Sequence, residues 1–125
     1  MKLLGFDFGR RRIGVALAIR GVASPLETIE FDSFSQAERR IAELCSLHRP
    51  EKMIWGFCRG KIGSQTVKFA KRVSGLVGLP VEFIDETLTS KDADIILVRN
   101  KKKKVKNDQL AAALILEYFL DEEGR

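Results

Sequence analysis

The first 31 residues contain three β-rich segments joined by connections too short to hold a helix. The segments are Leu3–Phe8, Ile13–Ile19 and Leu26–Phe31, and the connections are Gly9–Arg12 and Arg20–Pro25. Parallel neighbouring strands need a crossover of roughly a dozen residues or more, so connections this short favour antiparallel pairing. The chain therefore begins as an antiparallel meander.

After this meander, helix signals alternate with strand signals. The expected elements are a helix that opens on a capping box at Ser35 and Glu38 and ends at His48–Pro50, a strand Met53–Phe57, a helix with periodic apolar residues from Val67 to Val77 that ends at Gly78, a strand Pro80–Asp85, a short helix Ser90–Val98 and a final helix Asp108–Leu120. Such alternation implies crossover units and parallel pairing. We expect an α/β fold in which helices flank a five-stranded mixed sheet.

Size and charge narrow the function classes. At 125 residues, of which 45% are hydrophobic, the chain fits one domain over residues 1–125 with a real core. No cleavage-site pattern follows the first residues, and no apolar run approaches the roughly 18 residues of a membrane span, so we expect a cytoplasmic protein without membrane contact. Cys45 and Cys58 fit no metal or redox spacing and are expected to be free buried thiols in a reducing compartment.

Acidic residues stand at the ends of three separate elements. Asp7 closes the first strand between Gly5 and Gly9, and the pair Asp85–Glu86 closes the last strand. Parallel strands present their carboxyl ends at one edge of a sheet, where α/β folds place ligands. The sequence does not decide which acid of the pair faces Asp7, because strand ends often twist or bulge. Each acid alone could be an ordinary turn or capping residue.

Asp108 is the fourth acid, in the first turn of the last helix. It shares a helix face with Ala111, Ala112 and Ile115, so it is expected to project toward the sheet. An aspartate is also favourable at a helix N-terminus for electrostatic reasons alone, which is the alternative explanation.

Acids gathered from distant segments repel one another unless a cation lies between them. Oxygen-only ligands suit Mg²⁺ or Mn²⁺, and two such ions about 4 Å apart can activate water and stabilise the leaving oxygen in phosphodiester cleavage. We therefore expect a nuclease of the two-metal-ion type. The expected catalytic residues are Asp7, Asp85, Glu86 and Asp108, with Asp7, Glu86 and Asp108 as metal ligands.

Two basic clusters flank these acids. Arg10, Arg11 and Arg12 follow the Asp7 strand directly, and a second run precedes Asp108. The second run consists of Arg99, Lys101, Lys102, Lys103, Lys104 and Lys106. With a formal net charge of +5 and a pI near 9.4, these clusters are expected to contact a nucleic-acid backbone. A solvated lysine loop is the alternative for the second run.

Three motifs resemble those of the YqgF/RuvX family of Holliday-junction resolvases and pre-16S rRNA nucleases. Asp7-Phe8-Gly9 with Arg12-Ile13-Gly14-Val15-Ala16 resembles its opening motif, Asp85-Glu86-Thr87-Leu88-Thr89-Ser90 its middle motif, and Asp108 with Leu110 to Leu116 its closing motif. The resemblance covers nearly the whole chain. It implies a ribonuclease-H-like fold with the acids of the three motifs as metal ligands.

The chain departs from the family pattern in two places. Thr87 stands where the family usually has an arginine after the Asp-Glu pair, which removes a candidate phosphate contact. The segment Gly56–Ser64 differs from the usual loop after the fourth strand, so substrate positioning there is expected to differ.

Three functional hypotheses follow from these patterns. The first is a metal-dependent endonuclease acting on structured nucleic acid, with 5′-end processing of pre-16S rRNA ahead of cleavage of branched DNA; resolving a symmetric four-way junction would favour a homodimer. The second is an actin-like ATPase, which shares the opening motif but needs two such domains. The third is a non-catalytic RNA-binding factor for ribosome assembly, supported by the basic clusters alone.

Overall fold

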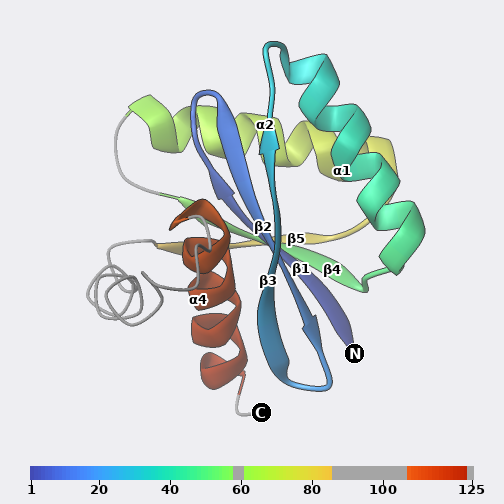
Figure 1. Cartoon of the computed structure of the whole chain (residues 1–125), viewed down its shortest axis with the longest axis vertical. Helices are drawn as coiled ribbons and strands as arrows, with labels where there is room; N and C mark the ends of the chain where they lie inside the picture. Colours follow the sequence, from blue (N-terminus) through green and yellow to red (C-terminus); the bar gives the residue numbers. More distant parts are fainter. Residues whose placement is uncertain (58–60, 86–106, 124–125) are drawn as a thin grey trace.

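The computed structural model describes residues 1–57, 61–85 and 107–123 and shows one mixed five-stranded sheet flanked by helices (Figure 1). The elements are β1 (Lys2–Phe8), β2 (Arg12–Ile19), β3 (Val22–Glu30), α1 (Phe34–His48), β4 (Lys52–Phe57), α2 (Lys61–Val77), β5 (Val81–Asp85) and α4 (Asn107–Glu122). The strand order is β3-β2-β1-β4-β5. The expected α/β class and five-stranded mixed sheet are confirmed.

The sheet changes from antiparallel to parallel pairing at its central strand. β1 pairs antiparallel with β2, and β2 pairs antiparallel with β3, which is the expected meander. On its other side β1 pairs parallel with β4, and β4 pairs parallel with β5. The carboxyl ends of β1, β4 and β5 therefore meet at one edge, which is the geometry that the acids at the strand ends require.

The connection between β2 and β3 is shorter than the sequence predicts. The strands meet at a two-residue turn, in which Arg20 and Gly21 have φ angles of 52° and 81°. β3 therefore begins at Val22, and the prediction that Arg20–Pro25 is a connection was wrong. Pro25 lies within β3 because an edge strand tolerates the loss of an N–H donor, and the register of this pair also shifts at Val15 and Ala16.

Helix α1 begins two residues earlier than its sequence predicts. Its N-cap is Ser33, whose Oγ accepts a hydrogen bond from the Gln36 N–H at 3.3 Å. The Gln36 side chain in turn accepts hydrogen bonds from the backbone N–H groups of Ser33 and Asp32. The predicted box at Ser35 and Glu38 was wrong: both pairs have the required spacing, and Glu38 is instead paired with Arg72 of α2.

Helix α2 is also longer than the periodic apolar residues indicate. It begins at Lys61, so the last part of the segment Gly56–Ser64 is helical and not loop. Gly63, which is unfavourable in a helix by about 1 kcal/mol relative to alanine, is buried there, so tertiary packing outweighs its local preference. The predicted final helix is confirmed, whereas the predicted helix Ser90–Val98 lies outside the described residues.

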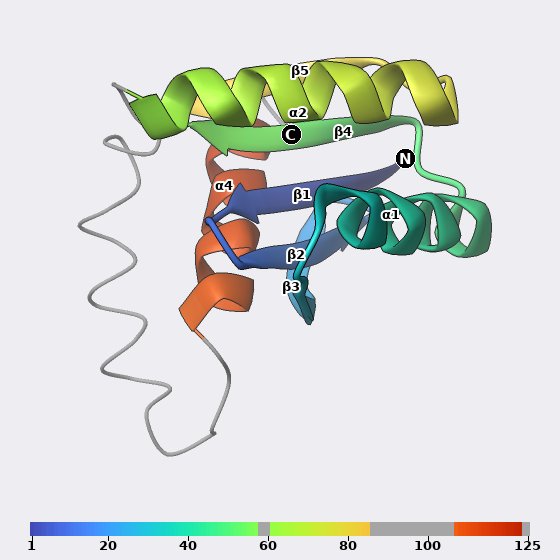
Figure 2. The same ribbon diagram turned by 90° about the horizontal axis from the view of Figure 1, so that it is seen from above.

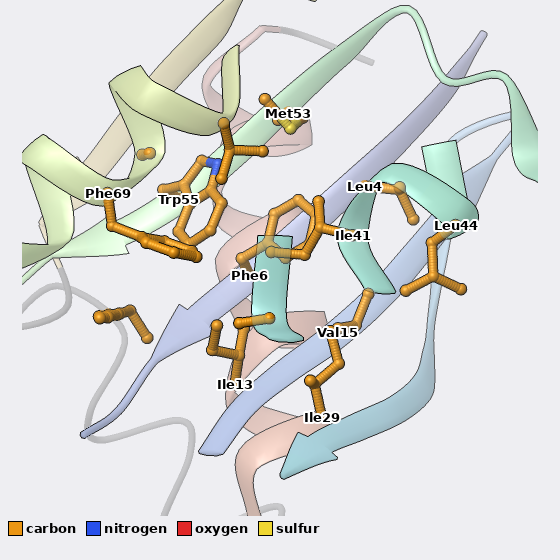
Figure 3. Packing of buried hydrophobic residues seen from close by; sticks show 14 of the residues in the cluster. Leu4, Phe6, Ile13, Val15, Ile29, Ile41, Leu44, Met53, Trp55 and Phe69 are labelled. Atoms are coloured by element: carbon orange, nitrogen blue, oxygen red, sulfur yellow. The ribbon is translucent and has the colours of Figure 1, made fainter. Parts of the chain in front are cut away.

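The two faces of the sheet carry separate cores. On the face of α1 and α2, Trp55 of β4 stacks on Phe6 of β1 with ring centroids 4.4 Å apart, and Phe69 of α2 packs against the edge of Trp55 (Figure 3). On the other face, α4 packs on small and aliphatic residues such as Ala16 and Ile54 (Figure 2). The expectation that Trp55 belongs to the core is confirmed.

Two further expectations concern the cysteines and the membrane. Cys45 is buried and free, as expected, and burial raises its pKa to about 11. Cys58 lies outside the described residues. Within residues 1–57, 61–85 and 107–123, the helices are too short or too polar to cross a membrane.

Candidate active site

Asp7 lies in the central strand, next to the end of β1. Its Cα partner on β2 is Gly14, and its partner on β4 is Gly56. Residues directly opposite one another in an antiparallel pair project to the same face of the sheet. Leu3, two pleats before Asp7, belongs to the core beneath α4, so Asp7 and Gly14 both face α4. The Asp7 side chain is partly buried there, with a glycine on each side.

The first turn of α4 lies directly against the strand position opposite Asp7. A Cβ atom on Gly14 would lie 1.8 Å from the backbone oxygen of Asp108, so only glycine fits there. Asp108 is therefore held next to the residue paired with Asp7, on the same face of the sheet. The two acids come from opposite ends of the sequence, and the structure places the backbone of Asp108 against the strand partner of Asp7; their joint role as metal ligands stays a prediction.

A second glycine allows the same close packing further along the helix. A Cβ atom on Gly5 would lie 2.4 Å from Cγ of Leu116. Gly5 and Gly14 thus set how closely α4 approaches the sheet. Gly14 was not among the predicted site residues, although a glycine inside a strand is a signal of close backbone approach.

Arg12 links the β1–β2 turn to the last helix. Its Nε lies 3.5 Å from Oδ2 of Asp108, with the two side chains 59% and 27% exposed. The turn that carries Arg12 is closed by a 2.8 Å hydrogen bond from the Gly9 N–H to the Arg12 carbonyl oxygen. A Cβ atom on Gly9 would lie 2.7 Å from that oxygen, so glycine is required for this turn.

The other two basic residues of the turn are exposed next to this ion pair. Arg10 and Arg11 have solvent-exposed side chains. Arg11 and Arg12 line an open hollow of about 630 Å³ together with Glu30, Phe31, Asp32 and Gln36. The predicted arginines are therefore exposed on this side, although the hollow itself carries two acidic and two basic residues. The second predicted cluster, which consists of Arg99, Lys101, Lys102, Lys103, Lys104 and Lys106, lies outside the described residues.

Asp85 ends β5 at the same edge of the sheet, one step beyond the row of Asp7. Its Cα partner on β4 is Phe57, whereas Asp7 is in register with Gly56. The Asp85 carboxylate nevertheless interacts electrostatically with Tyr118 of α4. The pKa of Tyr118 is raised mainly by loss of solvation, then by the charge and hydrogen bond of Glu122, and also by the charge of Asp85. Glu86, the other acid of the pair, lies outside the described residues.

The chemistry of the donors fits a hard divalent cation. Asp7 and Asp108 offer carboxylate oxygens on one face of the sheet, which is the ligand type that Mg²⁺ and Mn²⁺ prefer. In the part of the chain that the structure describes, no three acidic, histidine or cysteine side chains form a metal-binding group. A complete site would thus need a further ligand beyond Asp7 and Asp108.

The strand order β3-β2-β1-β4-β5, antiparallel on one side of β1 and parallel on the other, with helices on both faces, is that of the ribonuclease-H-like fold. Solved structures agree on the fold. The structure titled "T. thermophilus RuvC in complex with Holliday junction substrate" matches with a TM-score of 0.71 at 16% identity, covering 99% of this chain and 97% of that one. A fowlpox virus resolvase in complex with Holliday junction DNA matches with a TM-score of 0.66 at 14% identity over the full length of both chains.

Sequence comparison identifies the family. The family model described as "RuvX: Holliday junction resolvase" matches residues 1–122. A protein from Methylobacillus flagellatus named "Putative pre-16S rRNA nuclease" is 36% identical, covering 95% of this chain and 90% of its own length. A protein of the same name from Crocosphaera subtropica is 39% identical, covering 95% of this chain and 92% of its own length. The chain belongs to the RuvX family of nucleases.

Proposed function

We propose that this chain is a divalent-metal-dependent endonuclease that hydrolyses phosphodiester bonds in structured nucleic acid, with the 5′ end of pre-16S rRNA as its substrate. One observation carries the proposal: α4 is packed so closely over Gly14 that Asp108 lies beside the strand partner of Asp7. Arg12 pairs with Asp108 from the β1–β2 turn, and the carboxylate oxygens of Asp7 and Asp108 are the ligand type that a hard divalent cation prefers. The relatives named as pre-16S rRNA nucleases favour the RNA substrate.

Asp7 and Asp108 would hold the metal, with Glu86 or Asp85 as the third acid. Bound Mg²⁺ or Mn²⁺ would supply an activated water and stabilise the charge that develops on the leaving oxygen. The protein's own part is to fix the two carboxylates on rigid elements: Asp7 is held by strand pairing on both sides, and Asp108 by the contact of α4 with Gly14.

The arginines of the β1–β2 turn would hold the substrate backbone beside these acids. Arg10 and Arg11 are exposed and can approach a phosphate, and a guanidinium group binds two phosphate oxygens at once in a bidentate contact. Arg12 forms an ion pair with Asp108, so it would contact the nucleic-acid backbone next to the reacting phosphate. The cluster from Arg99 to Lys106 is proposed as a second backbone contact, on the basis of its sequence.

The decisive experiment compares two substrates under matched conditions. A labelled 5′ segment of precursor 16S rRNA and a labelled four-way DNA junction are incubated with the protein in Mn²⁺, in EDTA, and with the Asp7→Asn variant in Mn²⁺. We expect the wild-type protein to cleave the RNA in Mn²⁺, and we expect no cleavage in EDTA or by Asp7→Asn. Full cleavage by folded Asp7→Asn, or cleavage that persists in EDTA, would refute a metal site built on Asp7.

The third acid is assigned by two further variants in the same assay. Asp85→Asn and Glu86→Gln each remove one charge of the pair with little change in size. The variant that raises the Mn²⁺ concentration needed for half-maximal cleavage identifies the ligand. If neither changes this concentration, the pair is not part of the metal site.

A resolvase acting on branched DNA is the second candidate, favoured by the description of the family model. Symmetric cleavage of a four-way junction would need two active sites, and thus a dimer. Cleavage of the junction and not of the RNA, together with a dimeric mass in solution, would establish this role. Binding of the RNA without cleavage in any metal would instead support a non-catalytic assembly factor.

A further inference from the structure

One aromatic ring lies open at the surface near the acids. Phe34, the first residue of α1, is 51% exposed. Among the large apolar side chains that are exposed in the described part of the chain, it is the only aromatic one; the others are Met1, Ile19, Val22, Leu47 and Leu76. A single exposed apolar side chain is common on protein surfaces, so the surroundings of Phe34 decide whether it is suited to bind a planar ligand.

The ring of Phe34 is held in place from beneath. Its centroid lies 5.4 Å from that of Phe69, 5.9 Å from that of Phe31 and 6.1 Å from that of Phe8, with tilts of 41° to 46°. The Ser33 capping box fixes the backbone just before it. A ring fixed in this way loses little conformational freedom when a ligand stacks on it.

Phe34 borders a groove between the first turns of α1 and the middle of α2. The groove has a volume of about 400 Å³, and its other walls include Ser35, Gln65, Lys68, Phe69 and Arg72. This volume lies within the range of about 300 to 1,000 Å³ that is usual for sites of small organic groups. The groove therefore combines an aromatic platform with polar side chains that can hydrogen-bond to the edges of a planar ligand.

The charge of the groove is positive toward solvent. Glu38 is its acidic residue, but its side chain is only 12% exposed and is neutralised by Arg72 at 2.8 Å. The Arg72 side chain is 69% exposed, and Lys68 is exposed beside it. Positive charge around an aromatic platform is complementary to a nucleotide, whose base stacks while its phosphate binds cations.

The groove and the candidate active site lie on opposite faces of the sheet and are linked through adjacent residues of β1. Phe8, which contacts Phe34, packs in the core under α1 and α2, whereas Asp7, the residue before it, faces α4, so a nucleic-acid strand that used both sites would pass around the edge of the sheet. Gln36, two residues after Phe34, lines the hollow that contains Arg11 and Arg12. A strand whose phosphates contact Arg11 and Arg12 can thus extend over Phe34 toward Lys68.

We propose that Phe34 is a stacking platform for an unpaired base of the substrate strand, with Lys68 binding the adjacent phosphate. This inference rests on the proposed nuclease function and adds one property of the substrate to it. The nucleotides that lie over α1 and α2, next to the cleaved bond, are unpaired. A base within a duplex is stacked on its neighbours and cannot reach the ring. RNA and DNA present the same chemistry to the platform, so both are tested.

The test measures binding in EDTA, where cleavage does not interfere. Fluorescence anisotropy gives the affinity of the full chain for labelled single strands of about ten nucleotides, as RNA and as DNA, and for the matching duplexes. We expect Phe34→Ala to weaken binding of single strands about tenfold and to leave duplex binding unchanged. Phe34→Trp keeps a ring and retains the affinity.

Two controls separate stacking from general effects. Leu47→Ala removes another exposed apolar side chain, at the far end of α1, and should leave all affinities unchanged. Phe34→Leu keeps apolar volume without a ring, so it should bind as weakly as Phe34→Ala, and it replaces that variant if the alanine protein is unfolded. A single strand carrying 2-aminopurine should lose fluorescence on binding the wild type and not on binding Phe34→Leu.

Unchanged single-strand affinity in a folded Phe34→Leu protein would overturn the proposal and leave the groove to a protein partner. An equal loss of single-strand and duplex affinity would overturn it as well, because the ring would not distinguish an unpaired base. Neither result depends on cleavage, so the nuclease proposal can fail or hold independently.

Discussion

The two faces of the sheet carry side chains of different size. The face under α1 and α2 is filled by large rings, among them Phe6, Trp55 and Phe69, which pack in stacked and edge-on contacts. The face under α4 carries Gly5 and Gly14 and a row of alanines, so that the helix lies almost in backbone contact with the strands. Large side chains fill the space between the sheet and α1 and α2, whereas small residues keep the distance between the sheet and α4 short.

This difference shows how the fold separates stability from chemistry. Large side chains bury the apolar area that drives folding, at about 25 cal/mol per Å². Small residues bury less area, but they let Asp108 of α4 approach the strand pair that holds Asp7. A change at a buried residue of the ring-filled face that does not line the groove beside Phe34 should therefore cost stability alone, whereas a change on the α4 face should also cost activity.

The largest expected effect comes from Asp108→Asn. The substitution keeps the size of the side chain but removes the charge that would bind the metal, so we expect cleavage to fall by about 10³-fold, which corresponds to several kcal/mol of transition-state stabilisation. Single-turnover cleavage of the precursor RNA measures it, with circular dichroism as the control for folding. Retained activity would remove Asp108 from the site.

Gly14→Ala tests the close approach of α4. Its new methyl group would meet the Asp108 backbone at 1.8 Å, so the helix must shift, at a cost of about 1 to 3 kcal/mol in the free energy of unfolding. Urea denaturation measures the cost, and the shift should also lower cleavage. Gly75→Ala in α2 is the matched control, since its added Cβ meets nothing within 4 Å, and it should stabilise by about 0.5 to 1 kcal/mol. Equal effects of the two substitutions would contradict this account.

Ile41→Val probes the ring-filled face in the same way. Ile41 of α1 is fully buried, so loss of one methylene should lower the free energy of unfolding by about 0.5 to 1.5 kcal/mol. Cleavage per folded molecule should stay at the wild-type rate, because this side chain does not set the position of an acid. A drop in activity beyond the loss of folded protein would show that the two faces are coupled.

The smallest change in stability is expected from Arg12→Gln. The ion pair with Asp108 is 3.5 Å long and its arginine is 59% exposed, so water screens it and its loss should cost at most about 1 kcal/mol. Binding of RNA should nevertheless weaken, and its salt dependence should become less steep by about one charge. A titration at several salt concentrations checks this, and an unchanged slope would exclude a phosphate contact by Arg12.

Local sequence was a good guide to the elements and a weaker guide to their ends. Short connections gave the antiparallel meander, and alternation of apolar periods gave the parallel half of the sheet. The start of α1 was misplaced because Ser33–Gln36 and Ser35–Glu38 have the same capping spacing. Local pattern cannot choose between such pairs, whereas the contacts of Phe34 and Glu38 with α2 can.

The acids of the candidate site were named from the sequence, whereas the packing that surrounds them was not. The structure places the backbone of Asp108 against the strand partner of Asp7, and the role of the two acids as metal ligands stays a prediction. Gly14 was overlooked as a site residue, since its role exists only where α4 crosses β2. The choice between Asp85 and Glu86 stays a prediction for the metal-titration experiment.

The sequence by itself determined which strands pair antiparallel and which pair parallel, which acidic residues end the elements, and that a basic turn follows Asp7. These features depend on connection length, residue type and immediate neighbours. Tertiary structure alone decided how closely α4 approaches β2, which ring remains exposed, and where the groove beside it lies. Those features arise from contacts between residues far apart in the chain, and such contacts are set by how complete elements pack and not by any local preference.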